Sequence, residues 1–248
     1  MLKKDMKVTV VTVCYNAIDV IEKTILSVIN QTYSNIEYIV VDGNSNDGTI
    51  DVIKKYSDRI SRWVSEPDKG IYDAMNKGID LATGEWINFM NAGDFFVNDS
   101  VIEDIRLALQ ESHDVVYGNT IIVNGRYKKF YKAFLDNDKL PCFCHQSSFI
   151  STSLMKHYYY DDSFVIAGDT DFFYKVHKKG YNFFYVDMIV SVDDTNGVSS
   201  NNRVCVYKEV SRIKKSRLSK VKMIKYTIED AMPKWLMKKL MILTWYFD

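Results

Sequence analysis

The chain lacks the features that mark several classes of protein. Only 3 prolines and 11 glycines occur among its 248 residues, which excludes collagen-like and low-complexity chains and argues against long flexible linkers. Its 4 cysteines, Cys14, Cys142, Cys144 and Cys205, are irregularly spaced and form no disulfide framework, so we expect a reducing cytosol as the compartment. No internal repeat is visible, and residues 1–7 are charged and lack the apolar segment of a secretory signal.

The chain as a whole has no net charge, but its two parts carry opposite charges. Residues 201–248 hold 12 Lys and Arg against 4 Asp and Glu, a net of +8, whereas residues 1–200 hold 20 against 28, a net of −8. A basic tail on an acidic body predicts either that the tail meets an anionic surface or that it packs on the body as solvated helix. The tail carries no nucleic-acid motif, so we expect no nucleic-acid partner.

What the chain does have is a regular order of apolar segments, with 47% apolar residues to fill a core. Their spacing predicts strands at 8–13, 36–41, 62–65 and 86–90, alternating with helices at 21–29, 49–56, 71–82 and 98–110. This alternation predicts an α/β fold with a doubly wound, mostly parallel sheet. Beyond residue 115 we expect short antiparallel strands at 115–117, 120–123 and 128–131 with a hairpin turn at Asn124-Gly125, then a helix at 169–179, a strand at 182–186, and a helical tail from 204 to 247 broken near Pro233.

Three acidic turns stand out along this order. Asp42 ends one apolar run, Asp94 ends another after Ile87-Asn88-Phe89-Met90, and Asp169 and Asp171 form a pair far downstream. Ligands of α/β proteins bind at the carboxyl ends of strands. A carboxylate there can hold a hard divalent cation, which in turn can hold a diphosphate, so the turns predict a nucleotide-sugar site.

Five motifs in this order resemble the family 2 glycosyltransferases of GT-A fold, most closely the bacterial branch that builds O-antigen and capsule polysaccharide. They are Val10-Val11-Thr12-Val13-Cys14-Tyr15-Asn16, the Asp42 turn, Ser65-Glu66-Pro67-Asp68-Lys69-Gly70 with Asn76-Lys77-Gly78, Asn91-Ala92-Gly93-Asp94, and Gly168-Asp169. The resemblance covers about residues 6–200 and not the tail. It implies an inverting hexosyltransferase with Mn2+ or Mg2+, a UDP-sugar as donor and a lipid-linked glycan as acceptor. It also implies a cytoplasmic enzyme on the inner face of the cell membrane, with a homodimer possible. The implied domains are a GT-A domain over 1–200, with a nucleotide-sugar half (1–97) and an acceptor half (98–200), and a basic amphipathic tail over 201–248.

The resemblance assigns donor contacts to Val13, Tyr15, Asn16, Asp42, Asp68, Lys69, Asn76, Asn91, Ala92 and Gly93. Tyr15 would lie against the base and Asp42 would accept a hydrogen bond from the uracil or ribose. Relatives often have two acidic residues where this chain has Asp42-Gly43, so Asp68 is expected to share this contact. The alternative for Asp42 is an Asx-type turn. The helix that follows Lys69 would favour a phosphate at its start.

The remaining roles concern metal and catalysis. Asp94 is the implied metal ligand, although Asn91 and Gly93 replace the other carboxylates of the family's Asp-x-Asp motif. Asp169 is the implied base, because inverting transfer needs a carboxylate beside the acceptor hydroxyl. His145, Gln146 and Asp171 are expected near the acceptor or diphosphate. Simple structural roles are the alternatives, as helix caps for Asp94 and Asp169 and as a buried hydrogen-bonded side chain for His145.

Other functions would require sequence motifs different from those in this chain. Cys142-Phe143-Cys144-His145-Gln146 suggests zinc, but zinc sites pair two spaced ligand couples and no second couple is visible. A sugar nucleotidyltransferase would need a Gly-rich, basic loop after the first strand, which is absent there. The remaining alternative is an inactive nucleotide-sugar-binding or scaffold relative, which the joint presence of Asp94 and Asp169 disfavours.

The end of the tail mixes apolar and basic residues. Trp235, Leu236, Leu240, Leu243, Trp245 and Phe247 share a segment with Lys234, Lys238 and Lys239. The segment is too interrupted by lysine to span a bilayer, which needs about 20 mostly apolar residues. It predicts an amphipathic helix on an anionic membrane surface, with packing on the enzyme body or on a second subunit as the alternative.

Overall fold

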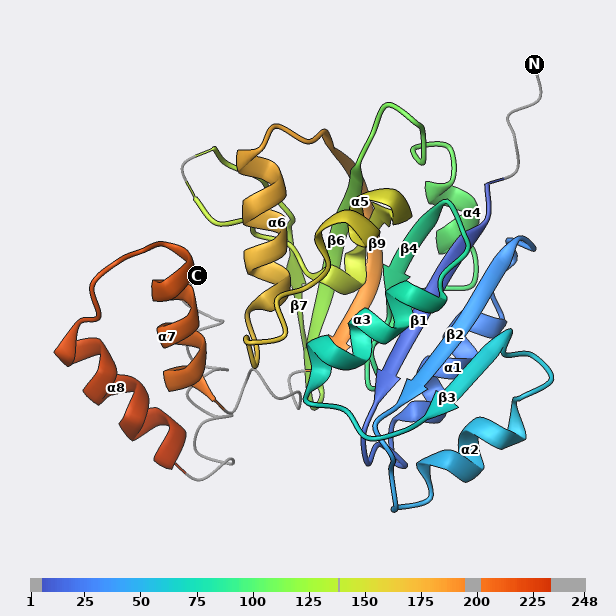
Figure 1. Cartoon of the computed structure of the whole chain (residues 1–248), viewed down its shortest axis with the longest axis horizontal. Helices are drawn as coiled ribbons and strands as arrows, with labels where there is room; N and C mark the ends of the chain where they lie inside the picture. Colours follow the sequence, from blue (N-terminus) through green and yellow to red (C-terminus); the bar gives the residue numbers. More distant parts are fainter. Residues whose placement is uncertain (1–5, 138, 195–201, 233–248) are drawn as a thin grey trace.

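A computed structural model describes residues 6–137, 139–194 and 202–232 of the chain (Figure 1). Within these residues one nine-stranded sheet runs in the order β3-β2-β1-β4-β8-β6-β9-β5, with β7 paired to β6. The first half supplies the parallel strands β1 (Val8–Cys14), β2 (Ile36–Asp42), β3 (Arg62–Ser65) and β4 (Trp86–Phe89). Every residue of β1 is buried, as expected for a central strand covered by helices on both faces.

Helices cover both faces of this sheet (Figure 1). On one face α3 (Ile71–Leu81), α5 (Thr152–Tyr158) and α6 (Gly168–Lys178) share a core with the inward residues of β1, β2 and β4. On the other face α1 (Ile21–Ile29), α2 (Thr49–Lys55) and α4 (Val101–Ile105) do the same. The apolar residues of α3 recur at helical spacing, and Gly78 within it lets the helix approach β1, because a Cβ there would lie 2.5 Å from Val11 Cγ1.

The second half extends the sheet in a mixed manner. β8 (Ser148–Ser151) is antiparallel to β4 and to β6 (Val115–Asn124), and β6 is parallel to β9 (Phe183–Asp194). β7 (Tyr127–Tyr131) forms the predicted hairpin with β6 across Asn124-Gly125, where Gly125 has φ 61°. β5 (Phe95–Phe96) pairs with the end of β9. The predicted fold class, a mostly parallel α/β sheet with a small antiparallel addition, is confirmed.

Several element boundaries differ from the prediction. The strands expected at 115–117 and 120–123 are one strand, β6, because Gly118 and Asn119 lie in an irregularity of its pairing with β9 and not in a turn. A Cβ at Gly118 would lie 2.8 Å from the carbonyl oxygen of Met188 on β9. The strand expected at 182–186 continues to Asp194, and the helix expected at 98–110 is only the short α4. The 3-10 turn η1 (His145–Ser147), β8 and α5 were not predicted.

The described part of the tail forms a hairpin of two helices, α7 (Arg203–Ile213) and α8 (Lys220–Ala231) (Figure 1). The rings of Tyr207 and Tyr226 lie 5.2 Å apart between the helices, and Arg203 pairs with Glu229. The break predicted near Pro233 and the apolar segment beyond it lie outside the described residues. Among the described helices, none is long and apolar enough to cross a membrane.

Candidate active site

The predicted acidic turns meet at one edge of the sheet. The backbone N–H of Gly43, after β2, donates to the carbonyl oxygen of Cys14 at 2.9 Å, and the N–H of Ala92, after β4, donates to that of Val13 at 3.1 Å. The turns after three neighbouring parallel strands are therefore held side by side. Asn16 adds a further link, because its N–H donates to Ser45 Oγ at 2.8 Å and its side-chain oxygen accepts from the N–H of Asn46.

Gly43 is the point where Tyr15 and Asp68 converge. A Cβ at position 43 would lie 2.4 Å from Asp68 Oδ2 and 3.3 Å from the Tyr15 ring. The carboxylate of Asp68 thus fills the space of a side chain at position 43, where relatives were expected to carry a second acidic residue. The Tyr15 ring is 65% exposed beside it, so an accessible aromatic face and a carboxylate flank the buried Gly43.

Asp42 lies behind this surface. Its side chain is fully buried, and it accepts hydrogen bonds from the N–H of Ser45 (2.9 Å), from Ser45 Oγ (2.5 Å) and from Ser65 Oγ (2.7 Å). These bonds give Asp42 the turn-forming role that the sequence left as its alternative. A contact between Asp42 and a nucleotide stays a prediction, and Asp68 is the accessible carboxylate of the pair.

The loop from β3 to α3 is held by hydrogen bonds between its carboxylates and its own backbone. Asp68 Oδ1 accepts from the N–H of Gly70 at 2.9 Å, and Asp73 accepts from the N–H of Lys69 at 3.1 Å. The Lys69 side chain is exposed just before the helix start. Asn76 lies farther along α3, and both its amide atoms bond the backbone of Tyr160, so in the structure it ties α3 to the loop before α6.

Asp94 is buried beside the carboxyl end of β9. One oxygen accepts from Gln146 Nε2 at 2.6 Å and the other from the N–H of Asp194 at 3.4 Å. The Asp193 carboxyl lies within hydrogen-bonding reach of it, and burial, followed by the charge of Asp193, raises the pKa of Asp94 well above its ordinary value. Burial also raises the pKa of Asp193. Two buried carboxyl groups this close together are not readily ionised at the same time, and a bound cation would relieve their repulsion.

The donor set suits a hard cation only in part. Asp94 and Asp193 offer carboxylate oxygens, and the buried Oδ1 of Asn91 has no hydrogen-bond partner, so oxygen ligands of the type that Mg2+ and Mn2+ take are present. No group of three or more His, Cys, Asp or Glu side chains in the described part of the chain could by itself hold a metal. A cation here would therefore need further oxygens from a diphosphate or from water.

Asp169 begins α6 and is held ionised. Its Oδ2 lies 2.9 Å from His145 Nδ1, and its Oδ1 accepts from the N–H of Thr170 at 2.7 Å and from the Tyr72 hydroxyl at 3.3 Å. Burial alone would raise the pKa of Asp169, but the hydrogen bond and charge of His145, together with the Thr170 and Tyr72 bonds, outweigh it and lower the pKa. The carboxylate is ready to accept a proton at neutral pH.

His145 connects Asp169 with the Asp94 turn. Asn91 Nδ2, a donor, lies 3.0 Å from His145 Nε2, so when the imidazole is neutral Nε2 accepts and Nδ1 carries the proton given to Asp169. The η1 turn that carries His145 is fixed by Asn88 of β4, whose amide donates to the carbonyl oxygens of Gln146 and Ser148. His145 and Gln146 thus contact the two carboxylates that the sequence singled out as base and metal ligand.

Three further residues of the predicted motifs have local structural roles. A Cβ at Gly168 would lie 2.8 to 3.0 Å from the Tyr72 ring, so glycine here makes room for Tyr72 to reach Asp169. Asp171 is buried on α6 and pairs with Lys175 at 2.5 Å, so its carboxylate stabilises the helix. Gly93, with φ 106°, donates its N–H to Thr24 Oγ1 and shapes the turn that ends in Asp94.

Sequence reasoning missed Tyr72, Asp193 and Glu209 at this site. Tyr72 is a buried residue of α3, and no role for it was predicted from the sequence. Asp193 lies at the end of a strand that was expected to stop at 186, and Glu209 lies in the tail. The Asp193-Asp194 pair after an apolar run was the one available signal for a fourth acidic segment.

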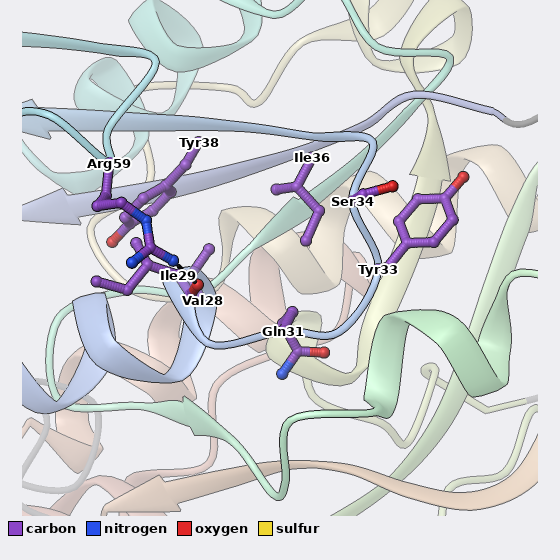
Figure 2. Close-up of a pocket in the computed structure, with 8 residues that line it drawn as sticks. All are labelled: Val28, Ile29, Gln31, Tyr33, Ser34, Ile36, Tyr38 and Arg59. Carbon is purple, nitrogen blue, oxygen red and sulfur yellow. Dashed lines mark hydrogen bonds between the residues drawn. The ribbon is translucent and has the colours of Figure 1, made fainter.

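A small open cavity of about 220 Å³ lies elsewhere (Figure 2). It is lined by Val28, Ile29, Gln31, Tyr33, Ser34, Ile36, Tyr38 and Arg59. These residues surround the start of β2, the end opposite Asp42, and the Arg59 guanidinium donates to the carbonyl oxygen of Ile29. The cavity therefore plays no part in the cluster of acidic turns.

Comparison with known proteins gives a family for this arrangement. Residues 9–180 match Glycosyl transferase family 2. An uncharacterized glycosyltransferase of Mycobacterium tuberculosis (strain CDC 1551 / Oshkosh) is 34% identical over 176 residues, which are 66% of this chain and 66% of that protein. A PGL/p-HBAD biosynthesis glycosyltransferase of Mycobacterium bovis (strain BCG / Pasteur 1173P2) is 31% identical over 136 residues, 52% of each chain. The chain thus spans between about half and two thirds of the length of these relatives.

Solved structures share the fold. S. aureus TarS residues 1–349 in complex with UDP matches with a TM-score of 0.66 and 20% identity, over 88% of this chain and 68% of that one. The mannosyltransferase PcManGT from Pyrobaculum calidifontis, in complex with GDP-Man and Mn2+, matches with a TM-score of 0.67 and 16% identity, over 84% and 63%. At these identities the likeness concerns the fold alone.

Proposed function

The chain belongs to glycosyl transferase family 2, and from that premise we propose that it moves a sugar from a nucleotide-sugar donor to an acceptor hydroxyl with inversion at the anomeric carbon. One observation carries the proposal. The ionised carboxylate of Asp169 bonds His145, whose other ring nitrogen bonds Asn91 in the turn that ends at Asp94. The neighbouring Gln146 donates to the Asp94 carboxyl, which lies against that of Asp193. Such transfer needs a proton acceptor and a site for the diphosphate, and this arrangement offers a candidate group for each of them side by side.

The donor occupies the edge formed by the first-half turns. Its base stacks on Tyr15 and contacts Asp68, its diphosphate meets the start of α3 near Lys69, and Asn91 to Gly93 line the sugar, with Val13 and Asn16 shaping the pocket wall. The accessible Tyr15 ring beside the Asp68 carboxylate supports the base contact. We assign UDP as the nucleotide. Fold neighbours bind UDP in one case and GDP-Man with Mn2+ in another, so the nucleotide must be tested directly.

Asp94 would be the protein ligand of a Mn2+ or Mg2+ ion bound together with the donor diphosphate, and the unpartnered Asn91 amide oxygen would be available as a further ligand. When bound, the cation neutralises charge that develops on the departing nucleoside diphosphate. The protein's own residues do the rest. Gln146 and the N–H of Asp194 hold the Asp94 carboxylate in place through hydrogen bonds of 2.6 and 3.4 Å.

Asp169 acts as the base. As the acceptor oxygen attacks the anomeric carbon, Asp169 takes the hydroxyl proton, and the bond from that carbon to the diphosphate oxygen breaks with its electron pair going to the diphosphate. Preorganisation by His145, Thr170 and Tyr72 keeps the carboxylate in one orientation, so little rearrangement is needed when the acceptor arrives.

The acceptor we assign is a lipid-linked glycan, in cell-surface polysaccharide synthesis of the O-antigen or capsule type, with the enzyme on the inner face of the membrane. The exposed face of α8 supports a membrane contact. Val221, Ile224 and Ile228 are 77%, 62% and 54% exposed, on the side of α8 away from the Tyr226 contact with α7, and Leu218, just before the helix, is 45% exposed. Residues 212–225 contain seven basic side chains and no acidic one, namely Arg212, Lys214, Lys215, Arg217, Lys220, Lys222 and Lys225. An apolar stripe rimmed by lysines suits the interface of an anionic bilayer.

Two experiments test these assignments. A nucleotide-release screen over UDP-, GDP- and dTDP-sugars, with Mn2+ or Mg2+ and lipid-linked acceptors, should give turnover with a UDP-sugar, whereas no turnover with any donor would favour an inactive relative. Flotation with anionic vesicles should carry the protein upward, and Val221→Asp with Ile224→Asp should abolish this, with neutral vesicles as control. Equal flotation of both proteins, or the appearance of a dimer that the double variant disrupts, would assign the face to protein contacts instead.

A further inference from the structure

The tail helix α7 inserts a carboxylate into the loop that precedes the base. The Glu209 side chain is only 9% exposed, and its oxygens accept hydrogen bonds from three consecutive backbone N–H groups, those of Val165 (2.7 Å), Ile166 (3.0 Å) and Ala167 (2.8 Å). These three residues lead directly into α6, where Asp169 is the second residue. Glu209 lies beyond residue 180, where the match to the family ends.

The same short loop is held from the opposite side by Tyr72. The Tyr72 hydroxyl donates to the carbonyl oxygen of Ile166 and lies 3.3 Å from Asp169 Oδ1. Gly168, between the loop and Asp169, packs against the Tyr72 ring without room for a Cβ. The backbone from 165 to 169 is therefore held between α7 and α3. Loss of the hydrogen bonds from either helix should shift this backbone and the Asp169 carboxylate with it.

Glu209 is the stronger of two attachments from α7. Arg212, one turn later, donates to Asp161 Oδ2 at 3.2 Å and Ser163 Oγ at 2.9 Å, but its side chain is 54% exposed, so water can replace these bonds. Glu209 is nearly buried, and without it three N–H groups would lose their acceptor. Hydrogen bonds to a charged acceptor are stronger than those between neutral groups, and the start of a helix favours an anion.

We infer that Glu209 is a positioning residue for Asp169, so that the tail completes the active site of the upstream domain. The inference rests on the proposed role of Asp169 as base. Glu209 touches no reacting group. It holds the backbone from which the Asp169 carboxylate projects toward His145, and a displacement of about 1 Å of a catalytic group can cost roughly 100-fold in rate.

The test compares Glu209→Gln with Glu229→Gln, a carboxylate of the same hairpin that pairs with Arg203 and Lys225 and does not contact the loop. Glu209→Gln keeps the side-chain shape but presents an amide to N–H groups. We expect kcat to fall by about 10- to 100-fold while the donor KM and the affinity for UDP with Mn2+ stay unchanged. The Glu229 variant should retain the wild-type kcat. Equal kcat in both variants, or a parallel loss of UDP affinity in the Glu209 variant, would overturn the inference.

A double-variant cycle separates this inference from the assignment of the base. If Glu209 acts through Asp169, then Glu209→Gln should have no further effect on the residual turnover of Asp169→Asn. Full additivity of the two losses would refute positioning. Wild-type turnover by Asp169→Asn alone would instead refute the base, and Glu209 with it. Should Glu209→Gln fail to fold, Val165→Pro removes a single N–H from the same set of bonds, and an unchanged kcat in that folded variant would also count against the inference.

Discussion

His145 gives the most informative single perturbation of this site, because its two ring nitrogens have different partners. Nδ1 lies 2.9 Å from the Asp169 carboxylate and Nε2 lies 3.0 Å from the Asn91 amide. An Asn side chain at position 145 can place its amide near the Nδ1 position, and a Gln can place its amide near the Nε2 position. The pair His145→Asn and His145→Gln therefore separates the contact with Asp169 from the contact with the Asp94 turn.

The size of the effect follows from the environment. The side chains of His145 and Asp169 are 14% and 20% exposed, so solvent screens the interaction weakly. A hydrogen bond to a charged group contributes about 1.5–3 kcal/mol, equivalent to roughly one to two orders of magnitude. His145 supplies the largest of the interactions that lower the pKa of Asp169, so its removal should shift that pKa upward. We expect His145→Gln to lower kcat by about 10- to 100-fold and His145→Asn to lower it less.

The pH dependence has a definite sign. A carboxylate with a lowered folded pKa stabilises the protein above its unfolded pKa, and this stability is lost as the pH falls through the folded pKa. Activity should follow the ionised form, so the acid limb of the kcat profile lies below the ordinary Asp range in the wild type and moves to higher pH in His145→Gln. The profile is measured by nucleotide release from neutral pH down to below the ordinary Asp range. An unmoved acid limb, or a Gln variant more active than the Asn variant, would refute this account of His145.

Three further predictions concern the donor side. Asp94→Ala should abolish the dependence of UDP affinity on Mn2+ without unfolding the protein, and unchanged affinity by calorimetry would remove Asp94 from the metal site. Burial and Asp193 raise the pKa of Asp94, so the contribution of Asp94 to stability is complete below an unfolded pKa of about 3.9 and is lost as the pH rises through the folded pKa. The metal-free protein should therefore lose stability on going toward neutral pH, and Asp94→Asn should lose less. Melting temperatures measured with chelator check this. Gly43→Ala should displace the Asp68 carboxylate, since its Cβ would lie 2.4 Å from Oδ2, and weaken UDP binding about tenfold in calorimetry, whereas Gly125→Ala on the distant hairpin should leave UDP affinity unchanged.

The first half of the fold could be predicted because its signals are local. β1, α1, β2 and α3 follow from apolar spacing within single segments, and their bounds agree with the structure to within a residue or two. The second half depends on pairing between distant segments. Gly118 and Asn119 resemble a turn until β9 is placed beside them, and β8 is a strand because β4 and β6 flank it.

The candidate site likewise contains residues that could be predicted from local motifs and contacts that could not. Asp94 and Asp169 could be singled out because each sits in a recognisable turn, and the structure joins them through His145 and Asn91. No local pattern indicated that Asn91 bonds a histidine 54 residues away or that Glu209 reaches the loop before Asp169. Such contacts between distant segments are set by tertiary packing, which single-segment periodicity does not contain.

The central claim is that Asp169 is the base of a glycosyl transfer, and Asp169→Asn tests it most directly. The substitution removes the proton acceptor and changes little volume, so the affinity for UDP with Mn2+, measured by calorimetry, should stay as in the wild type. Transfer to the acceptor should fall by about 10²–10⁴-fold, the usual range for loss of general base assistance. Transfer at a near wild-type rate by the folded variant would contradict the claim.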